Sequence, residues 1–240
     1  MKIEILYPEI TNIYGDGANI VFLEKMFDDI VLTHINEEPY FVKNDVDFIY
    51  MGSHSDEYDN LIVEKLMPHK DRLMQLIENN KIVLFTGTAI ELCGNHIEEN
   101  NKKIETLNLF PKLYFKRDKS KRFSSLFKGK YNDIDIVGNQ SQFSFMYGDN
   151  EYPFIKADDK CFGMNSESKQ EGIHYKNFFA TYLLGPFLIL NPLFVKELFR
   201  LMNCDKKIIF EDQLIKTYKN RVEILNQPDL VYVANEMNKI

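Results

Sequence analysis

The stretch from Lys81 to Gly94 has the pattern of a strand that leads through a tight turn into a helix. Ile82 to Phe85 is an apolar run with the length of a buried strand, and a predicted helix begins at Ala89. Between them lies a turn of small residues, Thr86-Gly87-Thr88. Many α/β enzymes present a nucleophile on such a turn, beside a helix N-terminus that can bind an oxyanion. Here the apex offers only a glycine and two threonines, and a threonine needs a base to activate it.

The composition argues against a protein that binds nucleic acid. The chain has 240 residues, of which 45% are hydrophobic and 27% are charged, and its formal net charge is -7. This acidic balance argues against binding to nucleic acid, which usually requires a basic face. One basic stretch, Lys112 to Lys130, is interpreted as a solvated loop or as a docking site for an acidic partner surface.

The cysteines and the apolar runs indicate a reduced, cytoplasmic setting. Cys93, Cys161 and Cys204 are far apart, and neither they nor the scattered histidines have the spacing of metal ligands. We therefore expect no metal and no cofactor. No run reaches the roughly 18 apolar residues of a membrane span, and the first residues lack a signal-peptide pattern, so no membrane insertion is expected.

Predicted strands and helices alternate along the first part of the chain. Strands are expected at 2–7, 30–35, 46–51 and 82–85, and helices at 17–27, at 60–79 with an interruption at Pro68, and from Ala89 to Cys93. This order is typical of a mostly parallel sheet with helices on both faces. Ligands bind beyond the carboxyl ends of the strands in such sheets, which is where Gly52 to Asp56 follow a strand.

The second half of the sequence is less regular. We expect hairpins and loops at 95–132, a strand at 134–137 closed by a polar turn at 138–142, and aromatic-rich loops at 143–172. A strand at 178–183 ends at Gly185-Pro186. Asn191-Pro192 should begin a helix, because a capping residue precedes a proline in the first turn. Another helix is expected at 211–222, and no linker divides the chain.

Four segments, in order, resemble the class I glutamine amidotransferases of the cobyric acid synthase type. The likeness is greatest to the glutaminase subunit of lipid II isoglutaminyl synthase, which amidates a peptidoglycan precursor with a Mur-ligase-like partner. The segments are the opening motif Leu6 to Ile20, the loop Met51 to Asp56, the turn and helix Gly87 to Gly94, and the strand Tyr175 to Pro186. The family has Gly-Gly-Gly-Gln-Asp at the second, Cys-Gly-Gly-Tyr-Gln-Leu-Leu-Gly at the third and Tyr-Lys-Asn-Val-Phe-Gly-Thr-Tyr-Leu-His-Gly-Pro at the fourth.

The resemblance implies a three-layer, flavodoxin-like α/β fold with a mostly parallel central sheet. It implies a glutamine amidotransferase-like domain over residues 1–205, with residues 206–240 as a C-terminal helix and tail of the same domain. It also implies chemistry that this sequence has lost. Family members hydrolyse glutamine through a cysteine thioester with a histidine base and a backbone oxyanion hole. Gly87 stands at the nucleophile's position and Leu184 at the base's position.

Several other residues are candidates to replace the missing nucleophile and base. Cys93 lies on the helix among apolar neighbours and is interpreted as a core cysteine rather than a displaced nucleophile. Thr86 and Thr88 lack the expected base, and Gln142 stands where the nearest relatives have a histidine. His54 could bind a ligand or serve as a new catalytic group, or have no role. Glu91 is expected to be structural, and the opening motif is expected to serve structure or a partner more than a pocket.

Two functions follow from the sequence. The first is a catalytically degenerate amidotransferase-like subunit that binds and supports a Mur-ligase-like or amide-synthetase-like partner in cell-wall precursor or cobyrate-type amidation. The second is a small-molecule-binding protein, or an enzyme of changed chemistry, that uses the former glutaminase pocket. The pocket candidates are Gly52, Ser53, His54, Ser55, Thr86, Thr88 and Gln142.

Overall fold

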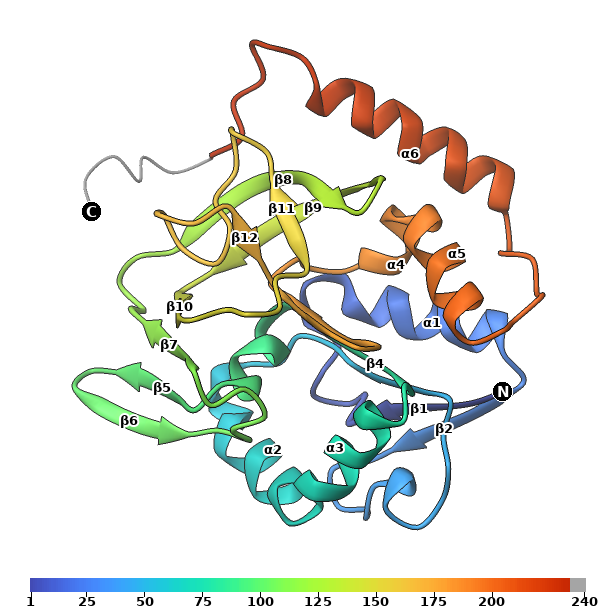
Figure 1. Ribbon diagram of the computed structural model, residues 1–240, viewed down its shortest axis with the longest axis vertical. Helices are drawn as coiled ribbons and strands as arrows, with labels where there is room; N and C mark the ends of the chain where they lie inside the picture. Colours follow the sequence, from blue (N-terminus) through green and yellow to red (C-terminus); the bar gives the residue numbers. More distant parts are fainter. Residues whose placement is uncertain (234–240) are drawn as a thin grey trace.

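The computed structural model describes residues 1–233, and these form an α/β structure around a six-stranded sheet (Figure 1). The order of the strands is β13-β14-β4-β3-β1-β2. Their bounds are β1 (Lys2–Leu6), β2 (Asp29–Thr33), β3 (Phe48–Met51), β4 (Ile82–Thr86), β13 (Ile173–Tyr175) and β14 (Phe178–Thr181). All neighbours pair in parallel except β13 and β14, which are antiparallel. The order β2-β1-β3-β4-β14 is flavodoxin-like, as the family resemblance implies.

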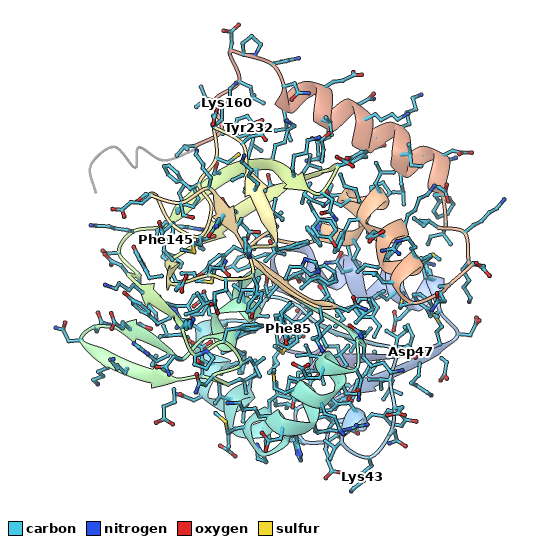
Figure 2. The ribbon with its side chains drawn as sticks, in the orientation of Figure 1. Lys43, Asp47, Phe85, Phe145, Lys160 and Tyr232 are labelled. Atoms are coloured by element: carbon cyan, nitrogen blue, oxygen red, sulfur yellow. The ribbon has the colours of Figure 1, made fainter. Side chains whose placement is uncertain are left out.

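The central strands are apolar on both sides because each face is covered by helices. Alternate residues of β3 and β4 divide between two cores: Tyr50 and Leu84 belong to one, Met51 and Phe85 to the other. The first core also contains side chains from α1 (Asp16–Met26), α4 (Phe187–Leu190), α5 (Pro192–Leu201) and α6 (Glu211–Leu225). The second contains side chains from α2 (Asp59–Leu66) and α3 (Lys70–Glu78). Figure 2 shows Phe85 in the interior of the molecule.

Two smaller sheets complete the described part of the chain, and side chains of one, among them Phe127 and Val137, belong to the first core. One has the order β10-β7-β5-β6 and the other β12-β11-β8-β9 within the described residues. Their strands are β5 (His96–Glu99), β6 (Lys102–Glu105), β7 (Leu113–Arg117), β8 (Phe123–Tyr131), β9 (Ile134–Gln142), β10 (Ser144–Gly148), β11 (Ile155–Ala157) and β12 (Gln170–Glu171). The expected hairpin region is confirmed. The polar turn predicted at 138–142 is wrong, because β9 continues through it, paired with β8 along nine residues.

Short 3-10 helices connect several elements: η1 (Ile13–Gly15), η2 (Tyr40–Val42), η3 (Asp56–Tyr58), η4 (Met67–His69) and η5 (Gly87–Cys93). The interruption expected at Pro68 is confirmed, since η4 separates α2 from α3. The helix start at Asn191-Pro192 is also confirmed, with Pro192 in the first turn of α5. The α-helix predicted from Ala89 is instead η5, a 3-10 segment that already begins at Gly87.

The segment after residue 205 packs on the rest of the chain. Tyr218 and Leu225 of α6 are buried in the first core, and the Tyr218 hydroxyl donates a hydrogen bond to the Asp135 carbonyl at 2.8 Å. Lys160 lies over the ring of Tyr232 at 5.5 Å, and Figure 2 places the two together. The division of a single domain into residues 1–205 and a C-terminal helix and tail at 206–240 stays a prediction. The end of the predicted tail, 234–240, lies outside the described residues.

Candidate functional site

The turn after β4 keeps the geometry of a nucleophile elbow. Gly87 has a φ of +59°, a left-handed conformation that glycine adopts more easily than other residues. It follows the buried strand directly, and its N–H donates to the Leu183 carbonyl at 3.2 Å. This hydrogen bond ties the elbow to the segment that follows β14. The sharp strand-to-helix turn is therefore present, with a hydrogen atom where an enzyme would have its reactive side chain.

The space beside Gly87 is occupied by Ser53. A Cβ atom added to Gly87 would overlap Ser53 Oγ and would lie 2.9 Å from Ser53 Cβ and 3.4 Å from Leu184 Cδ2. Ser53 is fully buried, and Leu184 is 9% exposed. The two positions that the resemblance assigns to nucleophile and base thus adjoin one another. Neither has a group that can attack a carbonyl or accept a proton.

Three backbone amides around the elbow donate hydrogen bonds within this chain. The Ser53 N–H donates to Asp16 Oδ2 at 2.6 Å, and the His54 N–H donates to Thr88 Oγ1 at 2.8 Å. Thr88 in turn donates its hydroxyl hydrogen to the His54 carbonyl at 2.8 Å. An oxyanion hole needs amide hydrogens that are free to meet a developing negative charge. Those of Ser53, His54 and Gly87 are all used within the chain.

Asp16, at the start of α1, holds the opening motif against the sheet. Its Oδ1 accepts hydrogen bonds from Asn19 Nδ2, the Tyr50 hydroxyl and Thr86 Oγ1, each at 2.9 Å. Burial raises the pKa of this carboxyl, while hydrogen bonds from Ser53, Tyr50 and Thr86 oppose the rise. The backbone of Gly52 passes so close that an added Cβ would lie 2.7 Å from Asp16 Cβ. Asp16, Gly52 and Thr86 therefore form a structural junction.

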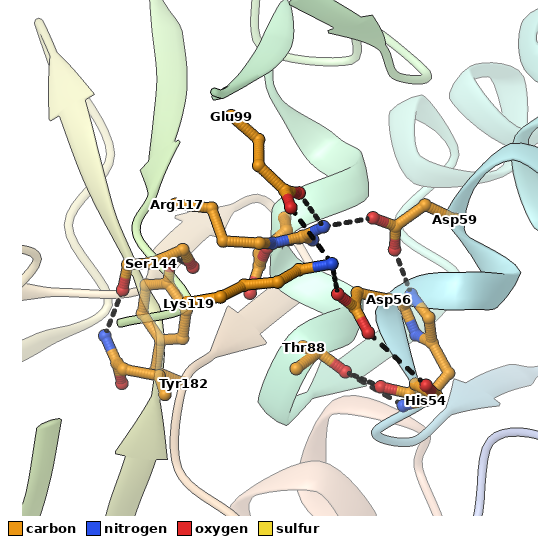
Figure 3. Close-up of polar contacts among 12 residues, drawn as sticks. His54, Asp56, Asp59, Thr88, Glu99, Arg117, Lys119, Ser144 and Tyr182 are labelled. Atoms are coloured by element: carbon orange, nitrogen blue, oxygen red, sulfur yellow. Dashed lines mark hydrogen bonds and ion pairs between the residues drawn. The ribbon is translucent and has the colours of Figure 1, made fainter. Parts of the chain in front are cut away.

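His54 is buried beyond β3 and faces an acidic residue of α2. Its Nε2 lies 2.9 Å from Asp59 Oδ1, and both side chains are almost fully buried. Asp59 also forms an ion pair with Arg117, with 2.7 Å between its Oδ2 and Arg117 Nη1. Figure 3 shows the imidazole directed at Asp59 and the Asp59 carboxylate lying between His54 and Arg117. His54 is therefore held in place by a charged network instead of lying free in a loop.

Arg117, the last residue of β7, is the centre of that network. Its Nη2 lies 2.5 Å from Glu91 Oε2, and its Nη1 lies 3.2 Å from Glu99 Oε2. Burial lowers the pKa of Arg117, but Glu91 and Asp59 outweigh it and raise the pKa overall. Burial raises the pKa of Glu91, and Arg117 opposes the rise. Glu91 is thus structural, as expected, although it acts by anchoring an arginine.

Beside the elbow lies a cavity of about 250 Å³. We call it the elbow cavity; it is lined by Ile13, Tyr14, His54, Ser55, Asp56, Thr88, Glu91, Arg117, Lys119, Ser141, Gln142 and Phe143. His54, Ser55, Thr88 and Gln142 of the predicted pocket residues are among them. Gly52, Ser53 and Thr86 are not, because they are packed at the Asp16 junction.

Several of these residues could not be assigned from the sequence. Arg117 belongs to the basic stretch that was interpreted as a solvated loop or a docking site, yet it is buried. Other side chains of that stretch form ion pairs within the chain: Lys112 with Glu151, Lys119 with Glu99, Lys128 with Asp158, and Lys130 with Asp135. The only sequence signal for Arg117 is its place among strand residues of alternating polarity, which does not identify its partners.

Cys93 lies at the end of η5, away from the elbow apex. It is fully buried, and burial raises the pKa of its thiol well above the usual range. Among residues 1–233, no group of three or more histidine, cysteine or acidic side chains is placed to hold a metal ion. In the same part of the chain, no helix is both long and apolar enough to cross a bilayer.

The fold and the elbow together define a class I glutamine amidotransferase scaffold. The model of the CobB/CobQ-like glutamine amidotransferase domain matches residues 2–191, and the chain belongs to this family. Solved structures share the fold at low identity. PurLQS from Thermotoga maritima has a TM-score of 0.55 at 10% identity, with 92% of this chain and 98% of that chain covered. A glutamine amidotransferase from Thermotoga maritima has a TM-score of 0.51 at 10% identity, with 94% and 93% covered.

Two curated relatives are similar over most of their length. One is the lipid II isoglutaminyl synthase (glutamine-hydrolyzing) subunit GatD of Streptococcus pneumoniae, 28% identical over 206 residues, with 80% of this chain and 76% of the relative covered. The other is the subunit of the same name from Staphylococcus aureus, 28% identical over 236 residues, with 95% and 93% covered. The predicted family and fold class are confirmed.

Proposed function

We propose that this protein is a glutamine amidotransferase-like subunit that has lost glutamine hydrolysis and supports a partner that forms amide bonds. The observation that carries the proposal is the elbow itself. Ser53 fills the space in which a side chain on Gly87 would lie, and Leu184 adjoins it. With no nucleophile at Gly87 and no base at Leu184, a glutamyl thioester has no residue on which to form.

The partner is inferred from the relatives. Both are subunits of a lipid II isoglutaminyl synthase, a name that describes amidation of a cell-wall precursor. By likeness, this chain would bind a Mur-ligase-like or amide-synthetase-like subunit in the same kind of reaction. The nitrogen would then come from free ammonia, because this chain supplies none from glutamine. The cytoplasmic location belongs to the same proposal, and so does the single domain formed by residues 1–205 with the C-terminal helix and tail at 206–240.

Reconstitution with a purified ligase-like partner tests this role. The pair should amidate its acceptor when ammonium chloride and ATP are supplied, and should form no amide when glutamine replaces ammonium. The partner alone serves as the control and should be less active or less stable than the pair. Amide formation from glutamine by the pair would contradict the proposal, and so would a partner that gains nothing from this subunit.

The elbow cavity supports a second candidate function, binding of a small molecule. The cavity has a volume of about 250 Å³, and charged and polar side chains line it. Of the residues named for this alternative, His54, Ser55, Thr88 and Gln142 line the cavity, whereas Ser53 and Thr86 do not. Leu184 does not line it. This function is compatible with the first, since a supporting subunit can also bind a ligand.

A further inference from the structure

β2 is an outer strand of the central sheet, and one of its two edges is open. Among the described residues it pairs only with β1, along all five of its residues. Figure 1 shows β2 at the margin of the sheet. At the opposite margin the edge of β13 is covered, because the His174 N–H donates to the Tyr152 carbonyl at 2.7 Å. The two ends of the sheet therefore differ in what they offer to another chain.

The pairing with β1 shows which peptide groups of β2 face outward. The Thr33 carbonyl faces β1, since it accepts a hydrogen bond from the Tyr7 N–H at 2.7 Å. Peptide groups alternate in direction along a strand, so those of Val31 face β1 as well, and those of Ile30 and Leu32 face away from it. Within residues 1–233, neither Ile30 nor Leu32 has a backbone hydrogen-bond partner on this outer side. The edge thus offers two donors and two acceptors.

The side chains along this edge are mostly apolar. Ile30 packs against the first core, and Leu32, on the same face of the strand, is 37% exposed. The charged residue of β2, Asp29, forms an ion pair with Lys2 of β1. β2 contains no lysine or proline, the residues that commonly keep an edge strand from pairing. Free peptide groups beside apolar side chains are what an added strand requires.

The open edge is complementary to itself in the antiparallel direction. When a two-fold axis passes beside Val31, Ile30 of one copy lies opposite Leu32 of the other, on both sides of the axis. Both residues face outward, so each of the two pairs exchanges two backbone hydrogen bonds. Their side chains then meet on one face of the joined sheet and continue the first core across the junction. A two-fold dimer needs only such a self-complementary surface.

The charged groups at the two ends of β2 are compatible with this register. Asp28 and Lys206 lie before the strand and form an ion pair at 3.1 Å, with the Asp28 side chain fully exposed. His34 follows the strand, beside Glu9 and Glu37. The antiparallel register brings Asp28 of one copy opposite His34 of the other, and Lys206 to the same end as Glu9 and Glu37. Each end of the dimer then unites groups of opposite sign.

We propose that two copies of this chain associate through β2, antiparallel and with the two-fold axis beside Val31, to form one continuous sheet. The two six-stranded sheets are joined edge to edge. The short edge makes a small interface, so the dimer is in exchange with the monomer. This inference does not rest on the loss of glutamine hydrolysis or on the binding of an amide-forming partner.

Sedimentation equilibrium of the full chain over a range of concentrations tests the association. The parent chain should pass from monomer to dimer as the concentration rises. Leu32→Pro removes one outward N–H and leaves the N–H groups that bond to β1, so it should weaken dimerisation at least about tenfold. Leu32→Lys, which keeps the backbone unchanged, should weaken it by a similar factor. Val21→Lys is the matched control: Val21 is 48% exposed on α1, outside the sheet, and the dissociation constant should stay within about twofold.

A cysteine beside the axis tests the register. Val31 lies opposite its own copy at a position without backbone hydrogen bonds, where Cα atoms are about 4.5 Å apart, a separation that allows a disulfide. Val31→Cys should therefore form a covalent dimer on oxidation with diamide. The background is Cys204→Ser, because Cys93 and Cys161 are buried. Leu32→Cys is the control: its two copies are about 8 Å apart, and it should cross-link at least about tenfold more slowly.

Three results would overturn the proposal. A parent chain that stays monomeric at every concentration would exclude the dimer. A dimer that persists in both Leu32→Pro and Leu32→Lys, in chains shown by circular dichroism to be folded, would place the interface elsewhere. A monomeric parent chain whose binding to an amide-forming partner is lost in Leu32→Lys would assign the open edge to that partner instead of a second copy. The proposed loss of glutamine hydrolysis would stand in each case.

Discussion

Ser53 Oγ occupies the position that a side chain on Gly87 would need. The two residues lie at the carboxyl ends of neighbouring parallel strands, β3 and β4, 34 positions apart in the sequence. The resemblance implies that Gly87 stands at the family nucleophile's position and that the family's loop has lost a glycine at Ser53 or His54. The absence of a side chain at Gly87 leaves the space that Ser53 fills, so the two residues are complementary in volume.

Restoring cysteine at the elbow should destabilise the protein. Gly87→Cys places a Cβ atom onto Ser53 Oγ, in a backbone conformation with φ of +59°. We expect a loss of roughly 1–3 kcal/mol in the free energy of unfolding, the usual range for overpacking. Urea denaturation measures it. The double variant Ser53→Gly with Gly87→Cys should recover part of the loss, and a single variant as stable as the parent chain would contradict the packing described here.

Removing the Asp16 carboxylate should disconnect the opening motif from the sheet. Asp16→Ala leaves the buried Ser53 N–H without its acceptor and removes the acceptor shared by Asn19, Tyr50 and Thr86, which retain hydrogen bonds to one another. We expect a loss of roughly 1–3 kcal/mol, the usual cost of leaving a buried donor unsatisfied. Asp159→Asn, at an exposed carboxylate, is the control and should change stability by no more than about 0.5 kcal/mol. Equal effects of the two variants would refute a structural role for Asp16.

Truncating Arg117 should be far more costly than truncating a surface lysine of the same stretch. Arg117→Met leaves Asp59 and Glu91 buried without their cation, and such a change typically costs about 3–5 kcal/mol. Lys112→Met removes a pair with Glu151 that is about half exposed, which should cost about 0–1 kcal/mol. Thermal or urea unfolding of both variants separates the two cases. If the two substitutions lower the free energy of unfolding by the same small amount, the carboxyl groups around Arg117 must be uncharged.

Stability should fall as the pH rises from about 4.5 to about 7, in part because of Glu171. This fully buried carboxyl accepts hydrogen bonds from Thr181 and from the Tyr182 N–H, yet burial raises its pKa from 4.5 to about 7. Between these values the folded state holds a proton that the unfolded state has released, so raising the pH favours unfolding. The loss is on the order of 3 kcal/mol across this range.

Urea denaturation at pH 5 and pH 8 measures the contribution of Glu171. Glu171→Gln should flatten the pH dependence of the parent chain, because the amide does not titrate. Glu223→Gln, at an exposed position of α6, controls for the removal of one carboxylate. A Glu171→Gln chain that retains the full pH dependence would assign the effect to another group.

The sequence predicts the parts of this fold that depend on local pattern. Apolar runs mark β1, β3 and β4, and the Asn-Pro pair marks the start of α5. The length of β9 could not be predicted, because Gly138 to Gln142 has the composition of a polar turn and becomes a strand only through pairing with β8. The 3-10 geometry of η5 is likewise set by the packing of the buried residues around it.

Of the candidate site, too, only a part can be predicted from the sequence. Gly87 and Leu184 can be placed opposite one another by the resemblance, because each lies in a segment with its own motif. The roles of Ser53 and Arg117 depend on contacts between residues 26 to 58 positions apart, such as Arg117 with Glu91 and with Asp59. Side-chain types at such distances do not reveal which pairs will meet. A serine in the loop after β3 gives no sign that it fills the place of a nucleophile's side chain.

Incubation of the purified chain with glutamine tests the central claim most directly. Glutamate release is measured with and without the amide-forming partner, and heat-treated protein gives the background. We predict release at the background level in both cases, because neither Gly87 nor Leu184 can form or resolve a thioester. Turnover above background that is abolished by Thr88→Val or His54→Phe, in chains shown to be folded, would contradict the account.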